Sequence, residues 1–236
     1  MREQVLRNAM ELAARAAKIV ASEARLAVRE RNLFTVAFSG GSTPWRMLRL
    51  LANEDVPWER THIFQVDERF APASHSQRNQ TGLTEALLNC LPTAPTGVHW
   101  MPVDDGDPDL AAASYAEELR SILGTNGSLD LVHLGLGDDG HTASLVPDDP
   151  ALEESGRDVA VTGPYRGFRR MTLTAPFLSR ARTILWIVSG PEKGPALARL
   201  RRGDPGIPAS RIDRGRALLL VDAAAHDASR DQRPPV

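Results

Sequence analysis

Apolar and polar positions alternate along the chain in blocks that predict strands and helices in turn. Compact apolar runs, typical of buried strands, occupy residues 33–41, 61–69, 98–103, 129–137, 183–190 and 217–222. Two shorter strands are expected at 158–163 and 169–175. Between these runs, the apolar residues recur at helical spacing in 1–20, 44–53, 81–91, 108–123 and 191–203.

This alternation of strands and helices indicates an α/β fold with a mainly parallel sheet that is covered by helices on both faces. The run 129–137 is apolar almost throughout, which is typical of a strand buried on both faces. No internal repeat or linker divides the chain. Residues 1–236 are therefore expected to form a single domain, with a flexible tail from about residue 226.

Composition narrows the possible partners. The 236 residues include 28 basic and 30 acidic side chains and carry a net charge of −2, so no partnership with nucleic acid or an anionic membrane is expected. Charges interrupt residues 1–20, which therefore lack the apolar core of a signal peptide. The single cysteine, Cys90, fits a reducing compartment and is expected to be a buried, inert thiol. These features favour a cytoplasmic protein.

Four polar clusters follow directly on predicted strands: residues 39–43, 67–69, 135–141 and 189–193. In open parallel sheets, ligands bind beyond the carboxyl ends of the strands. The four clusters are therefore expected to meet at one edge of the sheet.

The first cluster, Ser39-Gly40-Gly41-Ser42-Thr43, joins a strand to a helix. Such a turn can aim backbone N–H groups and two hydroxyls at an anion, with help from the helix dipole. A simple capped connection is the alternative. Because the turn lacks a Walker lysine, a nucleoside triphosphate is not favoured.

The second cluster ends a strand with Asp67, Glu68 and Arg69. Strand alternation places Asp67 and Arg69 on the same side, where they could contact a sugar hydroxyl and an anion, or simply pair with each other. Glu68 is expected to be a surface charge.

Three further cations belong to the second half of the chain. Lys193 lies at the start of a helix, where a positive charge opposes the helix dipole unless an anion offsets it. Arg169 and Arg170 begin the short strand expected at 169–175. Since neighbouring strand residues point to opposite sides, at most one of these arginines should reach the site.

Residues 135–141, GLGDDGH, allow two interpretations. The three glycines fit the G-x-G-x-x-G pattern of dinucleotide-binding loops. However, Asp138 and Asp139 would repel a pyrophosphate, which argues against that interpretation. His141 instead suits a general base that a nearby carboxylate, Asp139, orients. The other histidines lack such company and are expected to be structural: His62, His75, His99, His133 and His226.

Seven motifs in order make the chain resemble the 6-phosphogluconolactonases, which form a wider group with the glucosamine-6-phosphate deaminases. They are FSGGSTP, VDERF, the Asn79 region, LGLGDDGHTASLVP, RMTLTAPFL, VSGPEKGPAL and PASRI, and they span residues 34–222 approximately. The resemblance implies one three-layer α/β/α domain with a Rossmann-like sheet. It also implies hydrolysis of 6-phospho-D-glucono-1,5-lactone, a sugar-phosphate substrate, without a metal or organic cofactor.

The resemblance assigns roles to matching residues. Gly41, Ser42 and Thr43, with Gly40 beside them, would hold the phosphate, and Lys193 and Arg170 would neutralise it. Arg69 would contact phosphate or lactone, and His141 would be the general base. Asp139 would fix the imidazole tautomer, and backbone N–H groups of residues 137–141 are the candidates for the oxyanion hole. Asp67 and Asn79 complete the expected substrate contacts.

The chain departs from the family pattern after VDERF, where most members continue VP…SN and this sequence reads APASHSQRN. Asn79 is retained, but Arg78 occupies the place of the serine. Arg78 is therefore expected to add a positive group to the substrate site.

Three alternatives remain at this stage. The deaminases resemble DGHIAFNEP at the histidine loop, whereas DGHTASLVP places Val146 where their glutamate would be, and valine cannot transfer protons. A non-catalytic sugar-phosphate sensor would have no need of the Asp139–His141 pair. A nicotinamide-dependent oxidoreductase would show a fluorescence change on titration with NAD(P)H. A monomer or a weak homo-oligomer is expected.

Overall fold

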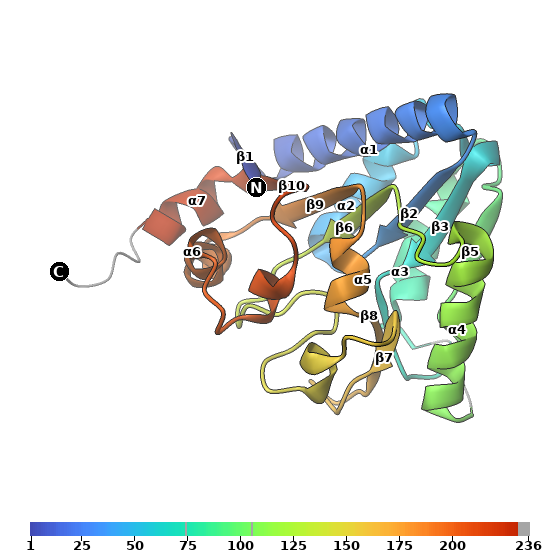
Figure 1. Ribbon diagram of the computed structural model, residues 1–236. Coiled ribbons are helices and arrows are strands. Elements are labelled where there is room, and N and C mark those ends of the chain that lie inside the picture. Colours follow the sequence, from blue (N-terminus) through green and yellow to red (C-terminus); the bar gives the residue numbers. More distant parts are fainter. Residues whose placement is uncertain (74, 105, 231–236) are drawn as a thin grey trace.

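The computed structural model describes residues 1–73, 75–104 and 106–230 (Figure 1). Their main sheet has seven strands in the order β1-β10-β9-β6-β2-β3-β5, with every neighbouring pair parallel. The strands are β1 (Arg2–Leu6), β2 (Phe34–Phe38), β3 (Thr61–Gln65), β5 (Gly97–His99), β6 (Leu131–Leu134), β9 (Thr183–Val188) and β10 (Ala217–Asp222).

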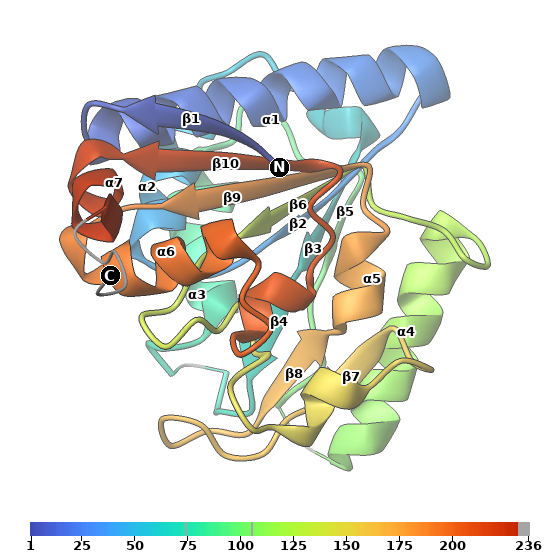
Figure 2. The same ribbon diagram turned by 60° about the vertical axis from the view of Figure 1, so that its left-hand side comes forward.

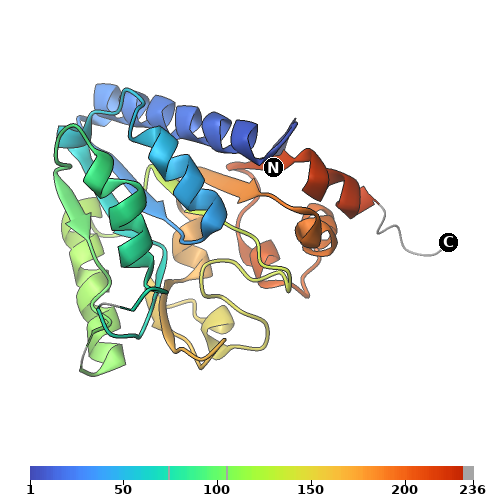
Figure 3. The same ribbon diagram turned by 180° about the vertical axis from the view of Figure 1, so that it is seen from behind.

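Helices cover both faces of this sheet (Figure 2). One face carries α1 (Ala9–Arg31), α2 (Ser42–Leu51) and α3 (Asn79–Ala86), which follow one another across it in Figure 3. The other carries α4 (Pro108–Leu123), α5 (Ala175–Ser179) and α6 (Gly194–Arg202), with α7 (Ala223–Arg230) packed on α6. Both faces are apolar, so both need a cover. In β2, Val36 and Phe38 enter the core beneath α1, whereas Ala37, which points the other way, enters the core on the opposite face. The predicted three-layer α/β/α architecture is confirmed.

A second, three-stranded antiparallel sheet lies beside the first. It consists of β4 (Asp67–Arg69), β8 (Arg170–Leu173) and β7 (Val159–Val161). The single strand predicted for 61–69 is therefore two strands in different sheets. Val66 joins them, because its N–H donates to the Phe38 carbonyl and its own carbonyl accepts from the Leu173 N–H. This junction places Asp67 and Arg69 at the edge of the main sheet.

Short 3₁₀ turns complete the chain. They are η1 (Trp58–Arg60), η2 (Leu88–Cys90), η3 (Pro150–Glu153), η4 (Pro191–Lys193) and η5 (Pro208–Arg211). Among the described residues, no helix combines the length and apolar character that a membrane crossing requires.

The N-terminal helix begins later than the periodicity of residues 1–20 predicts. Residues 2–6 form β1, which pairs with β10, and α1 begins only at Ala9. The Asn8 side chain caps this helix by accepting from the N–H groups of Met10 and Glu11. Pairing with a strand from the far end of the chain thus overrides the local helical pattern.

The expectation about the single cysteine is wrong. Cys90 is exposed rather than buried, because α3 ends at Ala86 and the thiol lies at the end of a 3₁₀ turn. Of the tail expected from about residue 226, residues 226–230 belong to α7, where Arg201 contacts both His226 and Ser229; the flexibility of the tail stays a prediction. Residues 231–236 lie outside the described residues.

Candidate active site

A cavity of about 240 Å³ lies where the carboxyl ends of β2, β3, β6 and β9 meet. All four polar clusters contribute to its wall, as the topology predicts. The lining includes Ser39, Gly40, Gly41, Ser42, Thr43, Asp67, Arg69, Asn79, Gly135, Gly137, Asp138, His141, Arg170, Ser189 and Lys193. Residues that are separated by 150 positions in the chain thus share one cavity.

The glycine–serine turn is fixed from beneath. The Ser39 hydroxyl donates to the His133 carbonyl (3.0 Å), and its N–H donates to Nδ1 of the buried His133 ring (3.3 Å). Burial lowers the pKa of His133 to about 3, so the ring stays neutral and can accept this bond. Gly41 has a φ of 128°, which favours glycine, and it is the N-cap of α2 without a side-chain cap. The N–H groups of Ser42 and Thr43, at the uncapped start of α2, therefore belong to residues of the cavity wall and can serve as anion donors.

His141 and Asp139 form a hydrogen-bonded pair. The ring Nδ1 lies 2.6 Å from Asp139 Oδ1, which also accepts from the His141 N–H at 3.1 Å. An ionised carboxylate can only accept, so Nδ1 carries the proton and Nε2 keeps its lone pair. Burial raises the pKa of Asp139, but hydrogen bonds from Tyr165 and from His141 outweigh it and bring the pKa to about 2. Asp139 is thus an ionised carboxylate that holds the imidazole of His141 through Nδ1.

The glycines of this loop serve its tight path around the histidine. Gly137 donates to the His141 carbonyl (2.8 Å), and Gly140, with a φ of 87°, donates to the Gly137 carbonyl (3.1 Å). A Cβ on Gly137 would overlap the His141 ring. Because the N–H groups of Gly137, Gly140 and His141 are all engaged within the loop, these three are not free to form the oxyanion hole.

Replacing Gly137 with alanine is expected to lower kcat by about 10²-fold, because the added methyl group displaces the imidazole by roughly its own size. Gly156→Ala is the matched control, since Gly156 does not line the cavity and a Cβ there meets only the Glu154 carboxylate, at 3.6 Å. Steady-state kinetics of both variants check this expectation. Equal losses in the two would contradict it.

Positive charge predominates in the cavity wall. Arg69, Arg166, Arg170 and Lys193 face only Asp67 and Asp138 as carboxylates. Arg170 is 5% exposed, and its Nε has no hydrogen-bond partner within the described residues. Desolvation lowers the pKa of Arg170. A buried guanidinium with an unsatisfied donor is a strong site for an anion.

The positions of Asp67 and Arg69 decide between two sequence interpretations. Asp67 accepts from the Ser144 hydroxyl (2.6 Å) and from the Asn79 amide, while Arg69 donates to Asn79 Oδ1 (2.9 Å). These two side chains therefore share Asn79 instead of forming a simple ion pair. Of the adjacent arginines at 169 and 170, only Arg170 lines the cavity, as strand alternation predicts.

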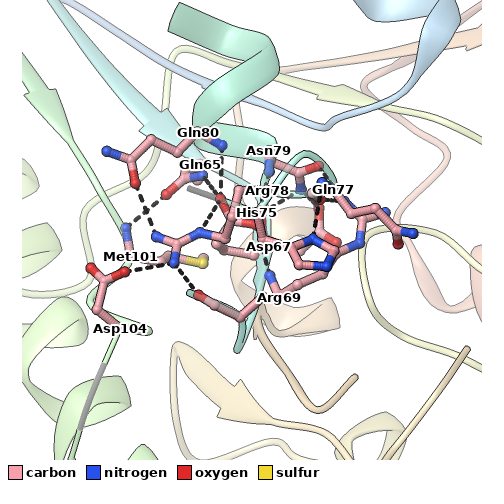
Figure 4. Close-up of polar contacts among 12 residues, drawn as sticks. Gln65, Asp67, Arg69, His75, Gln77, Arg78, Asn79, Gln80, Met101 and Asp104 are labelled. Carbon is pink, nitrogen blue, oxygen red and sulfur yellow. Dashed lines mark hydrogen bonds and ion pairs between the residues drawn. The ribbon is translucent and has the colours of Figure 1, made fainter. Parts of the chain in front are cut away.

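Arg78 does not line the cavity, which corrects the expectation that it adds charge there. It is 2% exposed, and Figure 4 shows its guanidinium directed at Asp104 and Gln80. It donates to Asp104 (2.7 Å), to Gln80 (2.9 Å) and to the Ala71 carbonyl (2.6 Å). Its role is to hold the segment that follows β4.

Glu68 is fully buried, so its interpretation as a surface charge is wrong. Its carboxylate accepts from the N–H groups of Arg69 (2.8 Å), Asn79 (2.9 Å) and Gln80 (2.8 Å), and lies 3.5 Å from Arg78 Nε. Glu68 thereby fixes the backbone of two cavity residues. Strand alternation already placed it opposite Asp67 and Arg69, but no sequence pattern identified its partner.

Two residues that contact the loop of His141 had no signal in the periodicity. Tyr165 and Arg166 lie in the hairpin between β7 and β8, where the Tyr165 hydroxyl donates to Asp139 (2.7 Å) and Arg166 pairs with Asp138 (3.1 Å). The Arg-Gly pair at 166–167, a turn between two short predicted strands, was the one available hint.

The fold and the site define an α/β enzyme with an anion pocket beside an imidazole–carboxylate pair. The model of the family "Glucosamine-6-phosphate isomerases/6-phosphogluconolactonase" matches residues 7–221. A 6-phosphogluconolactonase from Synechocystis sp. is 37% identical over 96% of this chain and 97% of its own. The human GDH/6PGL endoplasmic bifunctional protein is 38% identical over 76% of this chain and 24% of its own.

Solved structures of related enzymes have a similar fold. A 6-phosphogluconolactonase from Thermotoga maritima superposes with a TM-score of 0.83 at 26% identity, covering 94% of this chain and 98% of the other. A monomeric glucosamine-6-phosphate deaminase shares the fold, with a TM-score of 0.81 at 18% identity and coverage of 97% and 100%. The chain belongs to the glucosamine-6-phosphate isomerase/6-phosphogluconolactonase family. The sequence-based assignment to its 6-phosphogluconolactonases is confirmed.

Proposed function

We propose that this chain hydrolyses 6-phospho-D-glucono-1,5-lactone to 6-phospho-D-gluconate, a step of the oxidative pentose phosphate pathway. One observation carries the proposal: the His141 imidazole and the buried, unsatisfied Arg170 line the same cavity as the glycine–serine turn. A base and an anion cradle therefore face one space. The names of the relatives that match nearly the whole chain support the choice of lactone.

In the proposed mechanism, Nε2 of His141 takes a proton from water as the water oxygen attacks the lactone carbonyl carbon. The cationic side chains of the wall stabilise the tetrahedral oxyanion. When this intermediate collapses, the bond from the carbonyl carbon to the ring oxygen breaks. The imidazolium then returns its proton to the departing oxygen, and the Asp139 carboxylate stabilises the imidazolium in between.

The phosphate is held away from the reacting carbon. The N–H groups at the start of α2, the hydroxyls of Ser42 and Thr43, and the cations Lys193 and Arg170 make up the proposed cradle. Binding energy from this remote group positions the carbonyl carbon near His141. Asp67, Arg69 and Asn79 complete the proposed contacts to the sugar.

A coupled assay tests the proposal directly. Glucose-6-phosphate dehydrogenase generates the lactone in place, and acid production is measured above spontaneous hydrolysis with and without the chain. Glucosamine 6-phosphate is offered in parallel, with ammonia as the readout. Ammonia release without lactone hydrolysis would identify a deaminase, and tight phosphosugar binding without turnover of either would identify a sensor. The buried Val146, where deaminases have a glutamate, leads us to expect no ammonia.

A further inference from the structure

The second oxygen of the Asp139 carboxylate has a dedicated partner. Oδ1 faces the His141 ring, while Oδ2 accepts a hydrogen bond of 2.7 Å from the Tyr165 hydroxyl. The two rings meet edge to face, with centroids 5.5 Å apart and an interplanar angle of 64°. Tyr165 therefore contacts both members of the pair.

The hairpin that carries Tyr165 holds this side chain in place. Tyr165 and Phe168 exchange backbone hydrogen bonds across a two-residue turn, and both turn residues have positive φ, 50° at Arg166 and 87° at Gly167. A left-handed arginine is uncommon and costs conformational energy, so the hairpin holds Arg166 in a backbone conformation that arginine disfavours. The guanidinium carbons of Arg166 and Arg170 lie 5.2 and 5.1 Å from the centre of the tyrosine ring.

We propose that Tyr165 is a positioning residue for the Asp139–His141 pair, an inference that rests on the proposed lactonase function. By holding Oδ2, the hydroxyl keeps Oδ1 on the Nδ1 side of the imidazole. By sharing the negative charge of the carboxylate, it also limits how strongly Asp139 stabilises the protonated ring.

Other charges surround the pair and enter the same balance. Those lining the cavity wall are Asp67, Arg69, Asp138, Arg166, Arg170 and Lys193. Replacing Tyr165 with phenylalanine leaves all of them in place, and also keeps the aromatic ring that both guanidinium groups contact. The variant therefore isolates the hydroxyl.

Tyr165→Phe is expected to lower kcat by about threefold to tenfold with KM little changed, because the carboxylate loses its orientation. The acidic limb of kcat/KM should move to higher pH by on the order of half a pH unit. The sign follows from the charge: without the hydroxyl, Asp139 stabilises the imidazolium more strongly, so the base is lost to protonation at higher pH. The imidazole NMR signal of His141, assigned with His141→Asn, should shift its titration midpoint in the same direction.

The chain offers a matched control in its only other tyrosine. Tyr115 is fully buried and bonds to the Gln65 backbone, outside the cavity wall. Tyr115→Phe removes the same hydroxyl and is expected to leave both pH measurements unchanged. Thermal unfolding of both variants reports any general loss of stability.

An unchanged titration midpoint and acidic limb in Tyr165→Phe would overturn the inference, even if kcat fell. The NMR titration needs no substrate, so it tests Tyr165 independently of lactone turnover. If the wild-type chain hydrolyses the lactone but Tyr165→Phe has the wild-type titration midpoint and acidic limb, this inference fails and the proposed function stands. If the midpoint shifts but the wild-type chain has no lactonase activity, the proposed function fails and the Tyr165 contact stands.

Discussion

Replacing His141 with asparagine is expected to reduce kcat for lactone hydrolysis by about 10²–10⁴-fold. The asparagine amide can still donate to Asp139, as the ring Nδ1 does, so the loop keeps its shape. It has no basic nitrogen to replace Nε2, so the attacking water loses its proton acceptor. Steady-state kinetics in the coupled assay, corrected for spontaneous hydrolysis, measure this loss.

Ligand binding separates a lost base from a damaged pocket. The proposed phosphate cradle consists of residues from α2, β8 and the segment after β9, none of which contains His141. Calorimetric titration of His141→Asn with 6-phosphogluconate should therefore give nearly the wild-type affinity. His226→Asn, on α7 and outside the cavity wall, is the control for the substitution itself. A parallel loss of affinity and turnover would count against the base assignment.

The sequence predicted the elements whose local signals and packing agree. The helix expected at 108–123 is α4 over the same residues, because Asp107 caps its start, Pro108 suits the first turn and Gly124 ends it. The convergence of the polar clusters followed from a general property of parallel sheets: strands that share a direction place their following loops at one edge. For this reason, no side-chain geometry was needed to bring His141 and the glycine–serine turn to one cavity.

The contacts that the sequence could not predict depend on irregular backbone or on pairing between segments far apart in the chain. Tyr165 reaches Asp139 from a hairpin 26 residues away, and two left-handed residues set its direction. The edge strand β1 pairs with β10, more than 200 residues later in the chain. Glu68 and Arg78 are close in sequence, but whether their charges face solvent or each other depends on how the start of α3 packs against β4. Periodicity describes regular elements and contains no information about such returns.

Replacing Glu68 with alanine is expected to lower the free energy of unfolding by about 3–5 kcal/mol, the range for breaking a buried charged pair. The substitution leaves the N–H groups of Arg69, Asn79 and Gln80 without their acceptor, and it leaves Arg78 buried with only the half-exposed Asp104 as a charged partner. Urea denaturation measures the change. Glu85→Ala, an exposed glutamate on α3, is the matched control and should change stability by less than about 0.5 kcal/mol.

A double variant shows whether the loss comes from the uncompensated charge. Adding Arg78→Leu to Glu68→Ala removes the buried cation, so the double variant should be more stable than the sum of the two single losses predicts. Strict additivity would mean that Glu68 stabilises the fold through its other donors, the three backbone N–H groups and the Gln65 amide, and not through the charge of Arg78. In either case Arg69 and Asn79 lose their anchor, so KM for the lactone should rise in Glu68→Ala and stay unchanged in Glu85→Ala. A wild-type KM in Glu68→Ala would show that Arg69 and Asn79 keep their positions in the cavity wall without the buried carboxylate.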